Sequence, residues 1–147
     1  MAGTSTLSDE AVAIARGWLG TPYRHQASLM GVGCDCLGLI RGIYRELYGE
    51  ETEAVPPYAP DWAEAAGAET LAAAGHRHLD EIDVTDIQPG DVILFRWRPQ
   101  HPAKHAGILA TTATFIHAYD GTAVVESPLS PWWARRLAFA FRFRDRA

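Results

Sequence analysis

The chain is poor in the features that mark several large classes of protein. It has two cysteines, Cys34 and Cys36, and a bridge between residues two apart would be strained, so no structural disulfide is expected. No apolar run approaches the length of a membrane span. Residues 1–7 lack the basic start and apolar segment of a signal peptide. The sequence therefore predicts synthesis in the cytoplasm. If the protein acts outside the membrane, something else must carry it there.

The chain also has no large excess of positive or negative charge. The net charge is −5 and 21% of the residues are charged, which favours neither nucleic-acid binding nor disorder. The chain has 147 residues, 48% of them hydrophobic, so we expect one domain over residues 1–147 with a real core and no cofactor. The single basic cluster alternates with apolar residues, which indicates the solvated face of a strand: Arg135, Arg136, Arg142, Arg144 and Arg146.

Helix signals come first along the chain and strand signals follow. We expect helices at 8–19 with Ser8 as N-cap, at 36–48 closed by Gly49, and from 62 to about 74 after Asp61. His76 and His78 then fall on a loop as surface histidines. Strands are predicted at 92–97, 106–110, 114–118, 122–126 and 137–144. This order predicts an α+β fold with helices on one side of an antiparallel sheet.

Cys36 is the first candidate for chemistry. It opens a segment with helical spacing, and a cysteine at a helix N-terminus meets the positive end of the helix dipole, which favours the nucleophilic thiolate. The alternative is a small buried apolar residue on a helix face. Cys34 is the competing nucleophile, but it precedes the helix. The residues around both form the run Gly33-Cys34-Asp35-Cys36-Leu37-Gly38.

Two histidines in strand-like segments could complete a cysteine hydrolase. His105 would be the base and His117 the group that orients it, while His101 lies on a proline-broken loop. The alternatives are an edge histidine and a core histidine with local hydrogen bonds. The two rings share a sheet face only if the connection between their strands is a three- or five-residue loop or contains a bulge. A two-residue hairpin would place His117 on the opposite face.

Further residues could line such a site. Tyr23 could donate to an oxyanion beside the Cys36 amide, or it could be a packed turn aromatic. His25 could line the pocket, and Asp35 is expected to cap the helix. Trp97 could wall the cleft together with Trp132 and Trp133, although tryptophan is as often core or interface.

Five segments in order resemble the NlpC family of bacterial cell-wall cysteine peptidases, over residues 8–144. They are Gly20-Thr21-Pro22-Tyr23, Gly33-Cys34-Asp35-Cys36-Leu37-Gly38-Leu39, Pro89-Gly90-Asp91-Val92-Ile93-Leu94-Phe95, His105-Ala106-Gly107-Ile108 and Phe115-Ile116-His117-Ala118. The resemblance implies a papain-like NlpC fold with a triad of Cys36, His105 and His117. It also implies Tyr23 near the oxyanion and peptidoglycan stem peptides as substrate.

The chain departs from the family pattern in two places. Leu37 stands where the family usually has serine after the cysteine, and residues 49–88 form a longer segment than in simple members. With these features the chain looks most like single-domain peptidases of phage tails, prophages and gene transfer agents. The resemblance thus implies tail-tip or hub proteins as partners, no nucleic acid or membrane partner, and action in the cell-wall compartment.

Three other functions remain open at this level. The chain could be a non-catalytic tail-assembly or docking protein, with Trp132, Trp133 and the proline-rich residues 55–60 as its surface. It could be an amidase or acyltransferase of the same superfamily. A zinc site built from Cys34, Cys36 and histidines is the least favoured, because the cysteines lack a second pair at metal-ligand spacing.

Overall fold

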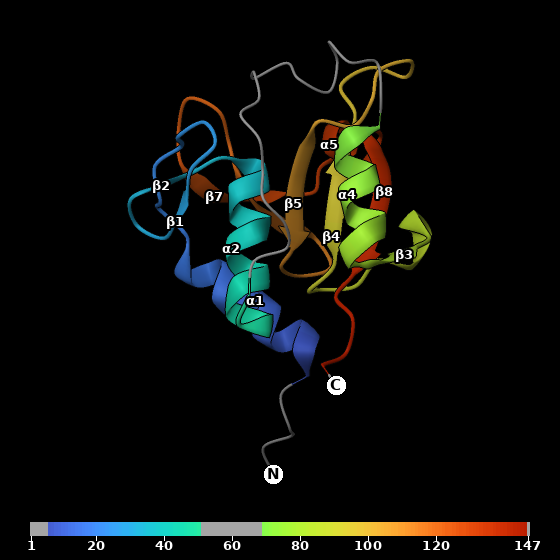
Figure 1. Cartoon of the computed structure of the whole chain (residues 1–147). Coiled ribbons are helices and arrows are strands. Elements are labelled where there is room, and N and C mark those ends of the chain that lie inside the picture. Colours follow the sequence, from blue (N-terminus) through green and yellow to red (C-terminus); the bar gives the residue numbers. More distant parts are fainter. Residues whose placement is uncertain (1–5, 51–68, 147) are drawn as a thin grey trace.

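A six-stranded antiparallel sheet organises the part of the chain that the computed structural model describes, residues 6–50 and 69–146 (Figure 1). The strand order is β3-β8-β4-β5-β6-β7, and a separate two-stranded sheet pairs β1 with β2. The helices are α1 (Leu7–Gly17), α2 (Cys36–Tyr48), α4 (Thr70–His78), the 3-10 turn η1 (Val84–Asp86) and α5 (Pro131–Ala134). The strands are β1 (Ser28–Leu29), β2 (Gly33–Cys34), β3 (Asp80–Ile82), β4 (Val92–Phe95), β5 (His105–Leu109), β6 (Thr114–Ala118), β7 (Val124–Pro128) and β8 (Leu137–Arg142).

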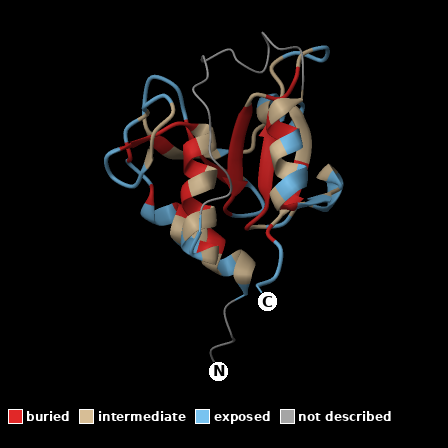
Figure 2. Cartoon of the chain, in the orientation of Figure 1, coloured by how far each residue is buried: buried red, intermediate tan, exposed pale blue. Residues whose placement is uncertain are grey.

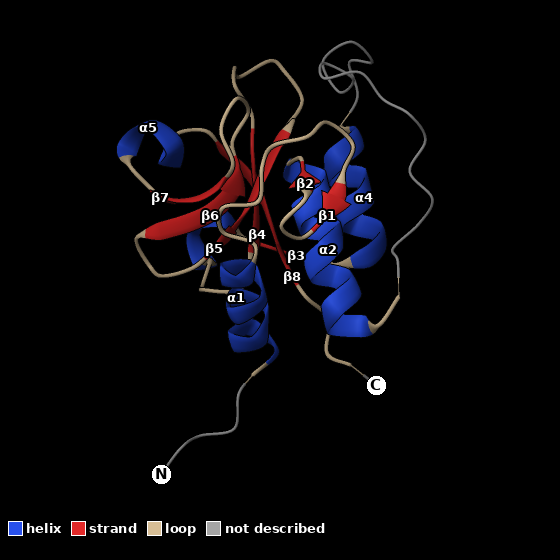
Figure 3. Ribbon diagram, turned by 90° about the vertical axis from the view of Figure 1, so that its left-hand side faces the viewer, coloured by secondary structure: helices blue, strands red, loops and turns tan. Residues whose placement is uncertain are grey.

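Both faces of the sheet are covered. Helix α2 packs on β5 and β6, α1 contacts α2 and β5, and α4 contacts β3. Figure 3 shows α2 and α4 on one side of the sheet and α5 on the other. The expectation of helices on one side alone is therefore incomplete, because the short helix α5 covers the second face.

Each face has its own apolar cluster. The larger one joins Trp18, the C-cap of α1, and Leu39 of α2 to Ile108 of β5. The smaller one joins Phe95, Phe115 and partly buried Trp133. Buried residues accordingly run through the central strands and the inward sides of the helices (Figure 2). Because side chains alternate along a strand, β5 contributes to both clusters.

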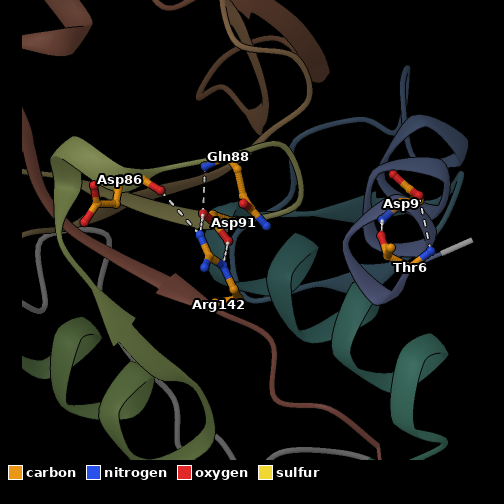
Figure 4. Close-up of polar contacts among 6 residues, drawn as sticks. All are labelled: Thr6, Asp9, Asp86, Gln88, Asp91 and Arg142. Atoms are coloured by element: carbon orange, nitrogen blue, oxygen red, sulfur yellow. Dashed lines mark hydrogen bonds and ion pairs between the residues drawn. The ribbon is translucent and has the colours of Figure 1, made fainter.

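The first helix begins earlier than the sequence predicted. Thr6, not Ser8, is the N-cap: the Asp9 amide donates to its hydroxyl, and the Thr6 amide donates to the Asp9 carboxylate (Figure 4). This reciprocal pair satisfies two amides that a helix start leaves free. The Ser8 prediction is wrong because the capping box selects the residue three before Asp9.

Other elements differ from the sequence-based expectations. His76 and His78 lie in the last turn of α4, not on a loop after it, and the predicted cap Asp61 lies outside the described residues. Strand β7 begins two residues later than predicted and includes Ser127. Elements β1, β2, β3, η1 and α5 were not predicted. Most are three residues or shorter, too short for periodicity to reveal.

A buried carboxylate ties the start of β4 to β8. Asp91 is fully buried and accepts two hydrogen bonds of 2.9 Å from Nε and Nη2 of Arg142, and a third from the Gln88 amide (Figure 4). The C-terminal arginines are thus not simply a solvated face, because Arg144 and Arg146 also pair with carboxylates. Asp91 is the buried member of this pair, while the Arg142 side chain is 36% exposed. Removing Asp91 would leave the Gln88 amide and the guanidinium without their shared acceptor.

Substituting Asp91 should therefore destabilise the fold strongly. We expect Asp91→Ala to lower the free energy of unfolding by about 2 kcal/mol in urea titrations, because a buried carboxylate that accepts three hydrogen bonds is lost. Asp80→Ala is the matched control, because Asp80 pairs with Arg144 at an exposed site. An exposed pair contributes less than about 1 kcal/mol. If both variants lost the same free energy of unfolding, the buried Asp91 carboxylate would contribute no more than an exposed one.

Candidate active site

The site begins at the N-terminus of α2, where Asp35 caps the helix. Its Oδ1 accepts from the Gly38 amide at 2.7 Å and its Oδ2 accepts from the Gln26 amide at 2.7 Å, so the carboxylate joins the preceding turn to the helix. Gly38 is needed here because a Cβ would lie 1.8 Å from the Ala27 carbonyl oxygen. The capping role predicted for Asp35 is confirmed, and it fixes Cys36 as the first helical residue.

A pocket of about 230 Å³ joins Cys36 to the strand that carries His105. Its lining residues are Tyr23, Cys36, Trp97, Lys104, His105, Ala118, Tyr119 and Asp120. The Cys36 thiol lies against the start of β5, with Sγ donating to the Lys104 carbonyl at 3.8 Å. The pocket is therefore bounded by a helix N-terminus on one side and by the beginning of β5 on the other.

The environment of Cys36 favours the thiol, contrary to the expectation from the helix dipole. Burial, and then the Asp35 carboxylate, raise the pKa of Cys36 to about 12. Backbone hydrogen bonds from Ala106, Leu37 and Cys36 act in the opposite direction but are outweighed. The thiol therefore needs a base to take its proton before it can act as a nucleophile.

The two histidines lie on one face of the sheet. Ile108 pairs with Ile116, and the Ala110 amide bonds to the Thr114 carbonyl, which leaves the three-residue loop 111–113. This register puts His117 beside Gly107, and a Cβ at position 107 would come within 3.2 Å of the His117 Cβ. The predicted shared face is confirmed, and the absence of a side chain at Gly107 makes room for the His117 ring.

The rings form a hydrogen-bonded series across three strands. His105 Nε2 lies 2.8 Å from His117 Nδ1, and His117 Nε2 lies 2.9 Å from the Ser127 Oγ. Burial, followed by the charge of His117, lowers the pKa of His105 to about 3, and burial lowers the pKa of His117 to about 4. Both rings are consequently neutral at pH 7. With Nε2 of His105 engaged, Nδ1 is the nitrogen that remains for the thiol.

Aromatic side chains enclose the histidine pair. The Trp97 ring stacks on His105 with centroids 5.3 Å apart, and Tyr119 stacks on His117 at the same centroid distance. Trp133 lies behind both rings, at 5.6 Å from His105 and 5.2 Å from His117. This enclosure accounts for the low pKa of each histidine, since it removes water that would stabilise the charged form.

Tyr23 enters the pocket as predicted, and its phenol stays protonated. Burial, and then the charge that Cys36 would carry, raise the pKa of Tyr23. Its backbone bridges to Cys34, which holds the ring next to the start of α2. A neutral phenol at this place can donate a hydrogen bond to an oxygen that becomes negative.

Some predicted residues lie outside the pocket lining. His25 is partly exposed, with Nδ1 3.9 Å from Asp35 Oδ2. Cys34 is fully buried in the core, and burial raises its pKa to about 12. Trp132 is 44% exposed and stacks under the guanidinium of Arg136. Among the described residues, no group of three or more histidine, cysteine or acidic side chains could hold a metal ion.

Sequence reasoning missed Ser127 and two residues that line the pocket, Tyr119 and Asp120. Ser127 was assigned to a loop because prolines follow it, and only the pairing of β6 with β7 brings its hydroxyl to His117. The alternation of Phe115, His117 and Tyr119 was the available signal for Tyr119. No helix in the described part of the chain is long and apolar enough to cross a membrane.

Comparison with known families identifies this arrangement. The NlpC/P60 family matches residues 20–142, which include Tyr23, Cys36 and both histidines. The chain belongs to the NlpC/P60 family. The motif-based recognition of the family is therefore confirmed, and so is the α+β NlpC fold.

The chain is similar in sequence to two bacterial proteins. It is 28% identical to the probable endopeptidase NlpC of Escherichia coli K12, covering 89% of this chain and 82% of that protein. It is 29% identical to the gamma-DL-glutamyl hydrolase of Bacillus subtilis strain 168, covering 97% of this chain. The match spans only 31% of the Bacillus protein. The similarity thus concerns one part of that longer enzyme.

Solved structures share the fold. The NlpC/p60 domain of the peptidoglycan hydrolase SagA superposes with a TM-score of 0.67 at 23% identity, covering 92% of this chain and 98% of that domain. NlpC2 from Trichomonas vaginalis gives the same TM-score and identity, covering 97% of this chain and 48% of that protein. At this level of identity the likeness establishes architecture alone.

Because both histidines are buried and neutral, we expect the folded protein to lose stability as the pH falls. Their folded pKa values lie below the ordinary 6.5, so the unfolded chain takes up protons first as the pH falls. Their stabilising contribution is complete above about pH 6.5 and is lost toward pH 4, by about 1.4 kcal/mol per pH unit for each ring. His117→Asn, which keeps an acceptor for His105, should flatten this decline in urea titrations from pH 7 to 4.5. Identical slopes for wild type and variant would refute the assignment.

Proposed function

We propose that the chain is a cysteine peptidase that hydrolyses amide bonds in the peptide stems of bacterial peptidoglycan. The observation that carries the proposal is the series Ser127–His117–His105, which ends at a pocket shared with the Cys36 thiol. Covalent acyl transfer needs a nucleophile, a base and a group that orients the base. Cys36, His105 and His117 can fill these three roles. The name of SagA, a peptidoglycan hydrolase, supports the substrate class. The names of the similar Escherichia coli and Bacillus subtilis proteins, a probable endopeptidase and a gamma-DL-glutamyl hydrolase, support hydrolysis of an amide bond.

The first half of the reaction forms an acyl-enzyme. His105 Nδ1 takes the thiol proton as the sulfur attacks the amide carbonyl carbon, because Cys36 rests as a thiol with a raised pKa. Tyr23 and the Cys36 amide donate to the oxyanion of the tetrahedral intermediate. His105 then returns the proton to the leaving amine, the C–N bond breaks, and a thioester remains on Cys36.

The second half releases the acid product. His105 removes a proton from water, the resulting hydroxide attacks the thioester carbonyl, and the C–S bond breaks. The sulfur recovers a proton from His105, which restores the starting state. His117 holds His105 in position throughout, and the aromatic enclosure keeps bulk water from the ring pair.

Digestion of purified peptidoglycan tests this proposal. Wild-type protein should release new stem-peptide fragments, identified by mass spectrometry, which also name the bond that is cut. Cys36→Ala should reduce their rate of release by at least about 10³-fold, because the nucleophile is gone. Cys34→Ala is the matched control, since Cys34 is buried away from the pocket and its loss should leave the rate within a few fold.

The outcome also separates the enzyme from a docking protein. No fragments from folded wild-type protein would contradict a free-standing peptidase. Equal activity in wild type and Cys36→Ala would contradict the role of the thiol. A transferase or amidase on another amide would instead give turnover only when that acceptor or substrate is supplied, again with loss in Cys36→Ala.

A second part of the proposal concerns where the protein acts. We infer, from the resemblance of the Cys34-Asp35-Cys36-Leu37-Gly38 variant to phage-tail peptidases, that the protein joins the tail of a phage-like particle through tail-tip or hub proteins and acts in the cell-wall compartment. The exposed Trp132 would suit contact with such a partner.

Particle fractionation tests this placement. If the protein is a tail component, antibodies should detect it in purified particles, at the tail by immunogold microscopy. Particles assembled with Cys36→Ala should form in normal number but enter cells poorly. Absence from purified particles, with free protein in the same lysate, would overturn the tail assignment and leave the peptidase proposal untouched.

A further inference from the structure

Ser127 ends the hydrogen-bonded series behind the candidate base. Its hydroxyl lies on the edge strand β7, 2.9 Å from Nε2 of His117. The His117 side chain is fully buried, so a ring nitrogen without a partner would cost the free energy of an unmade hydrogen bond. Three aromatic rings pack around His117. Their centroids lie 4.3 Å (Phe115), 5.3 Å (Tyr119) and 5.2 Å (Trp133) from the centroid of the His117 ring. The hydroxyl is therefore the partner that the described structure supplies for Nε2.

The direction of each hydrogen bond decides what His105 can do. A neutral histidine carries one ring proton, so one nitrogen donates and the other accepts. If His117 Nε2 donates to Ser127, its Nδ1 accepts from His105 Nε2. His105 then holds its proton on Nε2, and its Nδ1 has a free lone pair for the thiol proton. Both hydrogen bonds of the series are satisfied in this arrangement.

The opposite direction disables the base. If His117 carries its proton on Nδ1, it donates to His105 Nε2, and a neutral His105 must hold its own proton on Nδ1. That nitrogen could not accept the proton of Cys36. The distances between the rings are the same in both cases, so the geometry of the pair alone does not choose between them.

We propose that Ser127 is a positioning residue whose hydroxyl accepts from His117 Nε2 and thereby sets the tautomers of both histidines, leaving His105 Nδ1 free for the Cys36 proton. The inference deepens the proposed function and rests on it for its catalytic consequence. The contact between Ser127 and His117 is observed, whereas the direction of each hydrogen bond in the series is what the proposal adds. It extends the series beyond His117 to a residue that never touches the substrate.

Nitrogen-15 NMR of the full-length protein at pH 7 tests the tautomers without any substrate. Two-bond correlations distinguish the protonated from the bare ring nitrogen. In wild type both rings should carry the proton on Nε2. In Ser127→Ala, His117 should shift largely to the Nδ1–H form, and His105 should follow. Unchanged tautomers in Ser127→Ala would overturn the proposal, whether or not the protein cleaves peptidoglycan.

Kinetics test the catalytic consequence. Ser127→Ala should lower kcat by about 10- to 100-fold with little change in KM, the usual range for a partner that orients a functional histidine. Ser127→Thr, which restores a hydroxyl on a strand position, should recover most of kcat and the wild-type tautomers. Failure of the threonine variant to recover either readout would contradict a role for the hydroxyl.

Thr114→Ala is the matched control. The Thr114 hydroxyl donates to Glu126 at 2.7 Å, so this variant also removes a hydrogen bond between β6 and β7, on the sheet face opposite the histidines. It should leave kcat and both tautomers as in wild type. An equal loss of kcat in Thr114→Ala and Ser127→Ala would show that the hairpin, not the hydroxyl, is responsible, and would overturn the proposal.

Discussion

The pairing of β5 with β6 is the constraint on which the site depends. Ile108 opposite Ile116 places both isoleucines in the core beneath α2, while His105 and His117 share the other face. A slip of one residue would exchange the faces of β6, burying histidine against α2 and turning Ile116 away. Because both faces of this sheet are packed, the register is strongly determined. The hydrophobic pattern that folds the hairpin thus also aligns the ring nitrogens.

Burial sets the chemical state of the site. The N-terminus of α2 supplies backbone donors to the sulfur, yet loss of water and the Asp35 carboxylate dominate and keep Cys36 as a thiol. The same loss of water keeps both histidines neutral. A thiol beside a neutral imidazole is a pair in which proton transfer accompanies attack. The Asp35 carboxylate also holds together the turn and the helix that position the cysteine.

The sequence predicted long elements better than short ones. Helix α2 and strand β6 have the bounds that periodicity and capping predicted, with Gly49 closing the helix. Strand β3 and helix α5 were missed, since three or four residues carry too little periodicity. Strand β7 was misplaced because Pro128 was taken as a break, although proline is tolerated at the end of an edge strand. These errors matter, because α5 supplies Trp133 and β7 supplies Ser127.

The sequence by itself determined the family, the candidate nucleophile and the two histidines, because motif order and helix-start chemistry are local properties of the chain. It also stated the register condition that the histidines had to meet. Only the tertiary structure decided that the loop 111–113 meets it, that the thiol rests protonated, and that Ser127 reaches His117. The physical reason is that register, desolvation and cross-strand hydrogen bonds depend on which distant segments pack together. No local pattern specifies that packing.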